Sequence, residues 1–167
     1  MRRVMIILSI LSILVAGTAF AQHKEGPIDA AGGFISTNYN TTYEELTAIA
    51  FDSQNRSIIG TIMVKQVVGF NGNHVVACWV DWNNDGVFAS TYYTNEYVGV
   101  ATRYTPNPSS APQYYGVSIP ISPLPGTLNK NYNVKCILTW GEIPTNSNHN
   151  SIWGNAITGN IHIDALY

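Results

Sequence analysis

The segment from residue 81 to residue 86 has the residue types and spacing of a cation site. It reads Asp-Trp-Asn-Asn-Asp-Gly, which places the side-chain oxygens of Asp81, Asn83 and Asp85 at the first, third and fifth positions of a tight turn. Oxygen ligands at these positions can converge on one hard cation, and the main-chain carbonyl of the seventh residue, here Val87, often adds a ligand. Glycine at the sixth position permits the sharp backbone turn. The spacing therefore predicts a calcium-binding turn.

Glu96 is the expected source of the carboxylate that the turn itself lacks. In a helix–loop–helix calcium motif the twelfth position would be a bidentate Glu. Here that position is Tyr92, and a strand-like run precedes the turn. Glu96 begins the next predicted strand, so a β-hairpin would bring it back to the turn and complete an all-oxygen site for structural Ca²⁺. A turn without metal is the alternative, because Asn, Asp and Gly favour turns by themselves.

The N-terminal sequence predicts export. Arg2 and Arg3 precede an apolar run over 4–15, and Ala19-Phe20-Ala21 matches the small-x-small pattern of a cleavage site. We expect residues 1–21 to be a cleaved signal peptide, because the apolar run is shorter than the roughly 20 residues of a membrane span. An uncleaved signal anchor is the alternative. The expected mature protein is extracellular or at the cell surface, with no membrane span.

The charge of the expected mature chain argues against nucleic acid as a partner. After removal of residues 1–21, six basic and ten acidic residues remain, a net charge of −4 with His neutral. No basic patch is present to neutralise phosphates. The polar surface is expected to consist mainly of amides and hydroxyls.

Cys78 and Cys136 are the only cysteines, and both lie in strand-like apolar runs. An exported protein can keep a disulfide, so a bridge between neighbouring or facing strands is one interpretation. Two buried thiols are the other, because free Cys packs as a small hydrophobic residue.

The sequence shows no catalytic motif. None of the four histidines (His23, His74, His149 and His162) shares a short motif with another metal ligand, and we interpret each as a surface residue. No nucleophile elbow or paired-carboxylate motif stands out. We therefore predict a protein that is not an enzyme.

Short β-branched and aromatic runs between Asn, Gly, Pro and Ser clusters predict an all-β fold. The expected strands lie at 57–68, 74–80, 96–103, 114–121, 132–140 and 157–165. Residues 43–50 fit either a short helix or a strand. This rhythm predicts an antiparallel β-sandwich of about seven to nine strands, immunoglobulin-like or jelly-roll-like. We expect residues 22–56 to form an N-terminal arm or first strand, and residues 57–167 to form the sandwich.

The residues around the turn resemble the GEVED domain of secreted bacterial proteins. The segment 80–88, followed by Glu96, matches that family's apolar strand, Asp-aromatic-Asn-x-Asp-Gly-x-Phe turn and later Glu. Segments 115–120 and 134–140 resemble its following strands, so the resemblance covers roughly residues 74–165. The Gly-Glu-Val-Glu-Asp segment that names the family is absent, and a Trp-Gly-Asn ending at 153–155 stands in its place. The resemblance implies a sandwich, the cation turn and an accessory role without enzymatic activity.

We therefore expect a calcium-stabilised extracellular binding or adhesion module whose partner is a protein, a glycan or copies of itself. Trp82, Tyr92 and Tyr93 are candidate ligand contacts, because exposed rings serve as contact anchors and stack on sugars. The alternative is that these tyrosines bind no ligand, because strands commonly carry Tyr on half-buried surfaces. Two alternatives are a self-assembling surface or filament subunit that uses an N-terminal donor strand and a carbohydrate-binding module.

Overall fold

The computed structural model describes residues 35–38, 41–65, 72–88, 96–106, 112–122 and 128–164. This part of the chain forms eight strands and contains no helix that could span a membrane. The strands are β1 (Ile35–Asn38), β2 (Glu44–Asp52), β3 (Ser57–Val64), β4 (Gly72–Val80), β5 (Tyr97–Thr105), β6 (Gln113–Pro120), β7 (Lys130–Trp140) and β8 (Asn155–Ile163).

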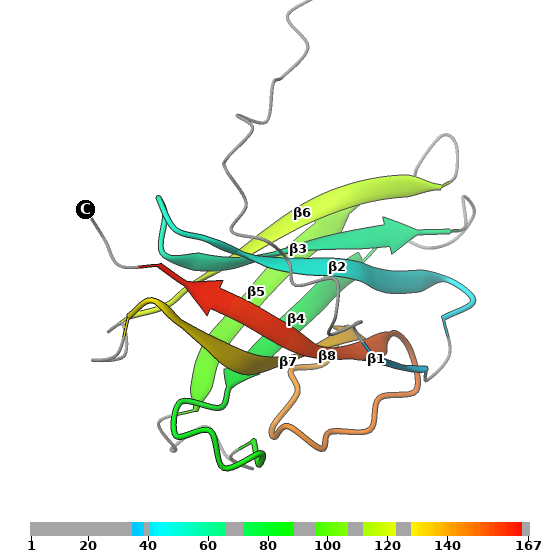
Figure 1. Cartoon of the computed structure of the whole chain (residues 1–167). Helices are drawn as coiled ribbons and strands as arrows, with labels where there is room; N and C mark the ends of the chain where they lie inside the picture. The colour runs from blue at the N-terminus through cyan, green and yellow to red at the C-terminus, as the bar shows by residue number, and fades with distance from the viewer. Residues whose placement is uncertain are drawn as a thin grey trace, which may run out of the picture.

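The strands form two sheets that pack face to face as a β-sandwich (Figure 1). One sheet has five strands in the order β1-β8-β7-β4-β5, and the other has three in the order β2-β3-β6. Every pair of neighbours is antiparallel. The prediction of an antiparallel sandwich with seven to nine strands is confirmed.

The main core lies between the sheets, and the two-residue period of the strands places it there. In β3, Ile58 and Ile62 are buried, whereas Ile59 points to the opposite face and is 39% exposed. Burying a side chain of this size contributes about 1.5–3 kcal/mol. The same alternation supplies the core positions of the larger sheet, including Val76, Val80, Val134, Leu138, Ile157 and Ile161.

Cys78 and Cys136 form a disulfide within this core. They are directly opposite each other on β4 and β7, with their Cα atoms 4.2 Å apart. This spacing is typical of a non-hydrogen-bonded pair in antiparallel strands. The bridge joins two interior strands of the five-stranded sheet, so of the two interpretations the disulfide is confirmed and the pair of buried thiols is wrong.

The N-terminal region contributes two strands to the sandwich in its described part. β1 pairs with β8, and β2 pairs with β3 along its length. Residues 44–50, for which the sequence left helix and strand open, belong to β2. The expected signal peptide and residues 22–34 lie outside the described residues.

Asn155 links the two sheets where β2 has an irregular register. Its fully buried side chain accepts a hydrogen bond from the Leu46 N–H (2.7 Å) and donates one to the Leu46 carbonyl (3.0 Å). The register of β2 on β3 shifts between Leu46 and Ala48. Gly154 precedes Asn155 with φ of 99°, and a Cβ there would lie 2.2 Å from the Leu138 carbonyl oxygen. These contacts explain why Gly occupies position 154 and Asn occupies position 155 in the Trp-Gly-Asn sequence.

Candidate metal centre

Asp81 follows the C-terminal end of β4, and its buried carboxylate organises the turn. Oδ1 accepts a hydrogen bond from the Asp85 N–H (3.1 Å), and Oδ2 accepts one from the Gly86 N–H (3.0 Å). The side-chain amide of Asn133 on β7 also donates to Oδ2 (3.2 Å). Asn84 and Gly86 have φ values of 57° and 80°, a left-handed conformation that Asn and Gly tolerate. The turn therefore wraps around the Asp81 carboxylate.

The approach of β5 to β4 brings Glu96 back to Asp81. The Val80 N–H donates a hydrogen bond to the Glu96 carbonyl (2.8 Å), and Glu96 is only 8% exposed. One carboxylate oxygen each from Asp81, Asp85 and Glu96 lie within 4.8 Å of one another. Asp81 and Glu96 are buried, whereas Asp85 is exposed. The structure thus gathers the three predicted carboxylate ligands into one cluster.

The donor set of this cluster fits Ca²⁺. Two oxygens that each lie about 2.3–2.6 Å from one calcium ion are at most about 5 Å apart, and the three carboxylates meet this limit. At an effective dielectric constant of about 20, two unit charges within 4.8 Å repel by roughly 3.5 kcal/mol or more. A divalent cation would offset this repulsion between Asp81 and Glu96. Asp81 Oδ1 and the two Asp85 oxygens each accept one hydrogen bond and keep a lone pair for a metal.

The other two predicted ligands lie on the exposed side of the turn. Asn83 Oδ1 accepts a hydrogen bond from the Asp85 N–H (2.9 Å), and Asn83 Nδ2 donates to Asp85 Oδ2 (2.9 Å). The Val87 N–H donates to Asp85 Oδ1 (2.8 Å), and Val87 is 63% exposed. These local bonds tie both residues to the exposed Asp85 carboxylate.

Aromatic residues fix the turn to both faces of the five-stranded sheet. Trp82 is half-buried and packs edge-on against Tyr132 of the main core, with ring centroids 5.1 Å apart. Phe88 packs on a second cluster, on the opposite face of the sheet. The Ser147 hydroxyl donates a hydrogen bond to the Phe88 carbonyl (3.1 Å), which joins the turn to the β7–β8 loop at the same end of the molecule (Figure 1). The second cluster consists of Ala77, Trp79, Ile137 and Ala156.

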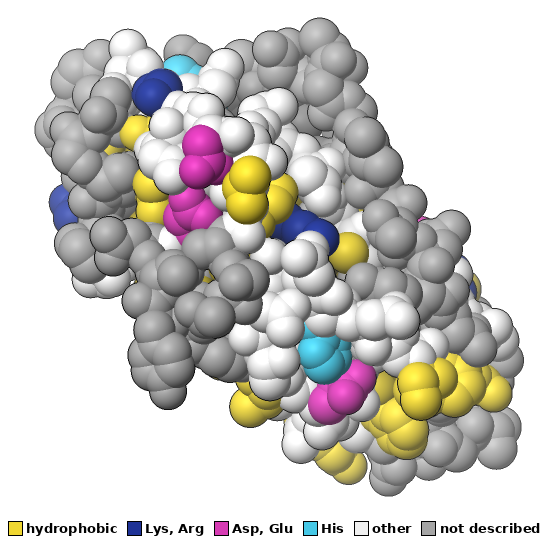
Figure 2. All heavy atoms as spheres, turned by 90° about the horizontal axis from the view of Figure 1, so that it is seen from below, with side chains coloured by type: hydrophobic (Ala, Val, Ile, Leu, Met, Phe, Trp, Pro, Cys, Tyr) yellow, Lys and Arg dark blue, Asp and Glu magenta, His cyan; other side chains and the backbone are white. Residues whose placement is uncertain are grey.

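Tyr92 and Tyr93 lie outside the described residues. Figure 2 views the molecule from this end, and the Lys and Arg side chains drawn on that face are dispersed among uncharged groups.

Glu142 belongs to a separate polar network in the β7–β8 loop. Its Oε1 accepts a hydrogen bond from the Ser151 hydroxyl (2.7 Å) and lies 3.4 Å from His149 Nε2. The hydrogen bond from Ser151 is the main cause of a lowered pKa of Glu142, and the nearby His149 imidazole lowers it further despite some desolvation. This network stabilises the loop that holds Phe88.

His74 does not lie on the surface, so its interpretation as a surface residue is wrong. Its side chain is fully buried, Nδ1 contacts Glu44 Oε2 of β2, and Nε2 lies 2.7 Å from Thr105 Oγ1 of β5. The order hydroxyl, imidazole, carboxylate is that of a catalytic triad. All three residues are 0% exposed, however, so a substrate has no access to the hydroxyl. The group is a polar link between the sheets, and its members lie on separate strands without a local motif.

Comparisons with protein-family models, with curated proteins and with solved structures found no match to this chain. The resemblance to the GEVED domain therefore stays a prediction from the turn and its flanking strands.

Proposed function

We propose that this protein is a secreted, non-catalytic β-sandwich that serves as an extracellular binding module and is stabilised by one Ca²⁺ ion at the Asp81 turn. The observation that carries this proposal is the convergence of Asp81, Asp85 and Glu96 within 4.8 Å. The predicted export signal supports it, because calcium sites in extracellular modules have dissociation constants of about 10⁻⁴–10⁻³ M.

In this proposal calcium acts on packing rather than on a reaction. The turn carries Trp82 to the main core and is followed by Phe88 on the second cluster. An ion that joins Asp81 and Asp85 to Glu96 would hold both rings against the five-stranded sheet. The expected result is a rigid end of the sandwich, suited to presenting a contact surface.

Thermal unfolding of the mature protein in EDTA and in excess Ca²⁺ tests this proposal. Binding to the folded state alone at a hundredfold excess over the Kd adds about 2.7 kcal/mol. For a chain of this size the midpoint should rise by roughly 5–10 °C. Tb³⁺ is a second probe, because Trp82 lies within the turn and should sensitise the luminescence of a lanthanide bound there.

Asp85→Asn should abolish the calcium shift with little effect on the midpoint in EDTA, because Asp85 is exposed and Asn keeps its shape. Asp52→Asn is the matched control. Asp52 also caps a turn, accepting hydrogen bonds from the N–H groups of Gln54 and Asn55, but it lies outside the carboxylate cluster. Coincident wild-type curves in EDTA and Ca²⁺ would refute the calcium proposal, as would an equal calcium response in wild type and Asp85→Asn.

A further inference from the structure

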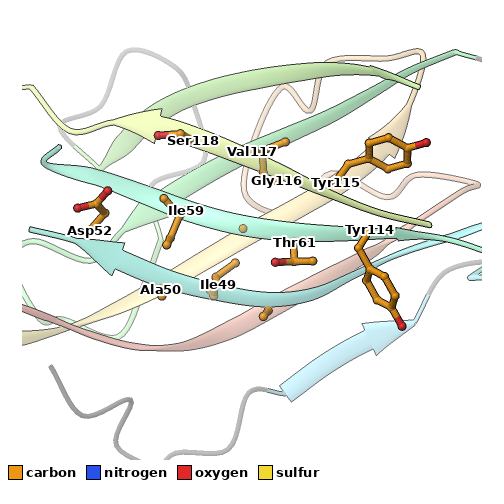
Figure 3. Close-up of a pocket in the computed structure, with 12 residues that line it drawn as sticks. Ile49, Ala50, Asp52, Ile59, Thr61, Tyr114, Tyr115, Gly116, Val117 and Ser118 are labelled. Atoms are coloured by element: carbon orange, nitrogen blue, oxygen red, sulfur yellow. The ribbon is translucent and has the colours of Figure 1, made fainter. Parts of the chain in front are cut away.

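The outer face of the three-stranded sheet carries a trough of about 660 Å³ that the calcium proposal does not use (Figure 3). Tyr114 lies at one end of this trough and Asp52 at the other. Between the ends, the strand register aligns two rows of side chains across β2, β3 and β6. The rows are Ala50, Ile59 and Ser118, followed by Ala48, Thr61 and Gly116. From Ser118 to Tyr114 the trough follows β6 for about 13 Å.

The trough combines an exposed aromatic ring with a hollow floor. Tyr114 is 62% exposed and Ile59 is 39% exposed. Between them lies Gly116, where an added Cβ would meet no heavy atom within 4 Å. A flat molecule with apolar faces could therefore lie along the sheet and contact both the ring and the isoleucine.

The lining favours an uncharged ligand. Among the described residues that line the trough, Asp52 is the only charged one. Its Oδ1 accepts hydrogen bonds from the N–H groups of Gln54 and Asn55, and its Oδ2 accepts one from the Asn55 side chain (2.7 Å). These bonds hold the carboxylate in its own turn, at one end of the trough. A charged group placed between the two rows of side chains would lose hydration, and the described residues of those rows offer it no opposite charge.

The backbone of the sheet makes an extended peptide a poor occupant. β3 pairs with β2 on one side and with β6 on the other from Ser57 to Val64. Its N–H and C=O groups are thus committed to the two ladders. Peptides that bind sheets add to an open edge. A peptide lying on this face would bury its backbone amides against apolar side chains, where the amides would lack hydrogen-bond partners.

A second copy of the chain also fits poorly. A two-fold contact places the same surface against itself, so the surface must be self-complementary. Two concave troughs brought face to face would enclose a void rather than fill it. The occupant should be narrow, convex and uncharged.

We propose that this trough binds a neutral polysaccharide chain. The apolar faces of its sugar rings would stack on Tyr114 and Ile59, and its hydroxyls would reach Thr61, Ser118 and solvent. The Ser118 hydroxyl donates to Ser57 Oγ (3.0 Å) and keeps acceptor capacity for a sugar hydroxyl. This inference rests on the proposed role as an extracellular binding module, but it does not depend on calcium.

Retention of the mature protein on immobilised cellulose, xylan, mannan and starch tests the inference, with anionic pectate and heparin as comparison matrices. We expect retention on at least one neutral matrix. Tyr114→Ala should weaken that binding about tenfold or more, whereas Tyr114→Phe should keep it, because the ring supplies the contact. Tyr104→Ala is the matched control, because Tyr104 is 58% exposed on β5 of the other sheet and should not affect binding.

Gly116→Ile provides a second variant that fills the trough from its floor. The open space at Gly116 accepts a side chain, and a β-branched residue suits a strand, so the thermal midpoint should not fall. Loss of binding by this folded variant would therefore report blockage of the trough.

Retention of the wild type on none of the neutral matrices would overturn the inference, as would equal binding by wild type, Tyr114→Ala and Gly116→Ile. A wild-type dimer that Gly116→Ile converts to monomer would identify a second copy as the occupant and would also overturn it. Each assay is run in EDTA and in Ca²⁺. Glycan binding without a calcium shift would refute only the calcium site, and a calcium shift without glycan binding would refute only the trough.

Discussion

The buried contact between His74 and Glu44 should contribute far more to the free energy of unfolding than the ion pair between Glu45 and Lys65. Glu45 follows Glu44 on β2. His74 and Glu44 have no exposed side-chain surface, whereas the side chains of Glu45 and Lys65 are 30% and 29% exposed. Removing one member of a buried pair leaves the other without compensation and costs about 3–5 kcal/mol. A pair near the surface contributes about 0–1 kcal/mol.

We therefore expect His74→Leu and Glu44→Met each to lower the thermal midpoint by roughly 6–20 °C, at about 2–4 °C per kcal/mol for a chain of this size. Glu45→Gln is the matched control and should lower it by less than about 4 °C. The double variant removes both polar partners and replaces them with apolar groups. In the double variant the Thr105 hydroxyl loses its hydrogen-bond partner His74, and this loss should cost about 1–3 kcal/mol of unfolding free energy.

Urea unfolding of the four proteins in this double-mutant cycle gives the coupling free energy directly. We expect the double variant to be several kcal/mol more stable than the sum of the two single losses would imply. Additive losses, or a His74→Leu loss no larger than that of Glu45→Gln, would show that the two side chains do not form a buried pair.

Two further predictions concern the disulfide and acid stability. The Cys78–Cys136 bridge closes a loop with a sequence separation of 58. On the chain-entropy estimate, the Cys78→Ala/Cys136→Ala variant should lose about 4 kcal/mol of unfolding free energy. Urea unfolding beside the oxidised wild type measures this loss, and an unchanged midpoint would contradict it. The lowered pKa of Glu142 means that its stabilising contribution is complete above the ordinary value of 4.5 and is lost as the pH falls through the lowered pKa. The stability difference between wild type and Glu142→Gln, measured by urea unfolding across the acid range, should therefore shrink on acidification below 4.5, and a constant difference would refute the assignment.

Local sequence patterns were sufficient to predict six of the eight strands and the Asp81 turn, whereas the part of β2 within residues 43–50 was left open between helix and strand. The alternation of Ile161, His162 and Ile163 and the turn clusters between runs indicate strands, because the two-residue period is a property of the extended backbone. The Asp81 turn was also visible in the sequence, because its candidate oxygen ligands are close in sequence and its glycine marks the bend. The return of Glu96 to the turn required only a β-hairpin.

The tertiary structure decided the features that depend on register and on sheet packing. The alignment of β4 with β7 places Cys78 opposite Cys136, and the stacking of the sheets places His74 against Glu44. The link from Asn155 to Leu46 and the trough along β2, β3 and β6 likewise join residues that are distant in sequence. Strand propensity is the same in any register, whereas a shift of one residue turns every side chain to the other face. The pairing of strands and the burial of apolar surface between the sheets therefore determine which distant side chains meet.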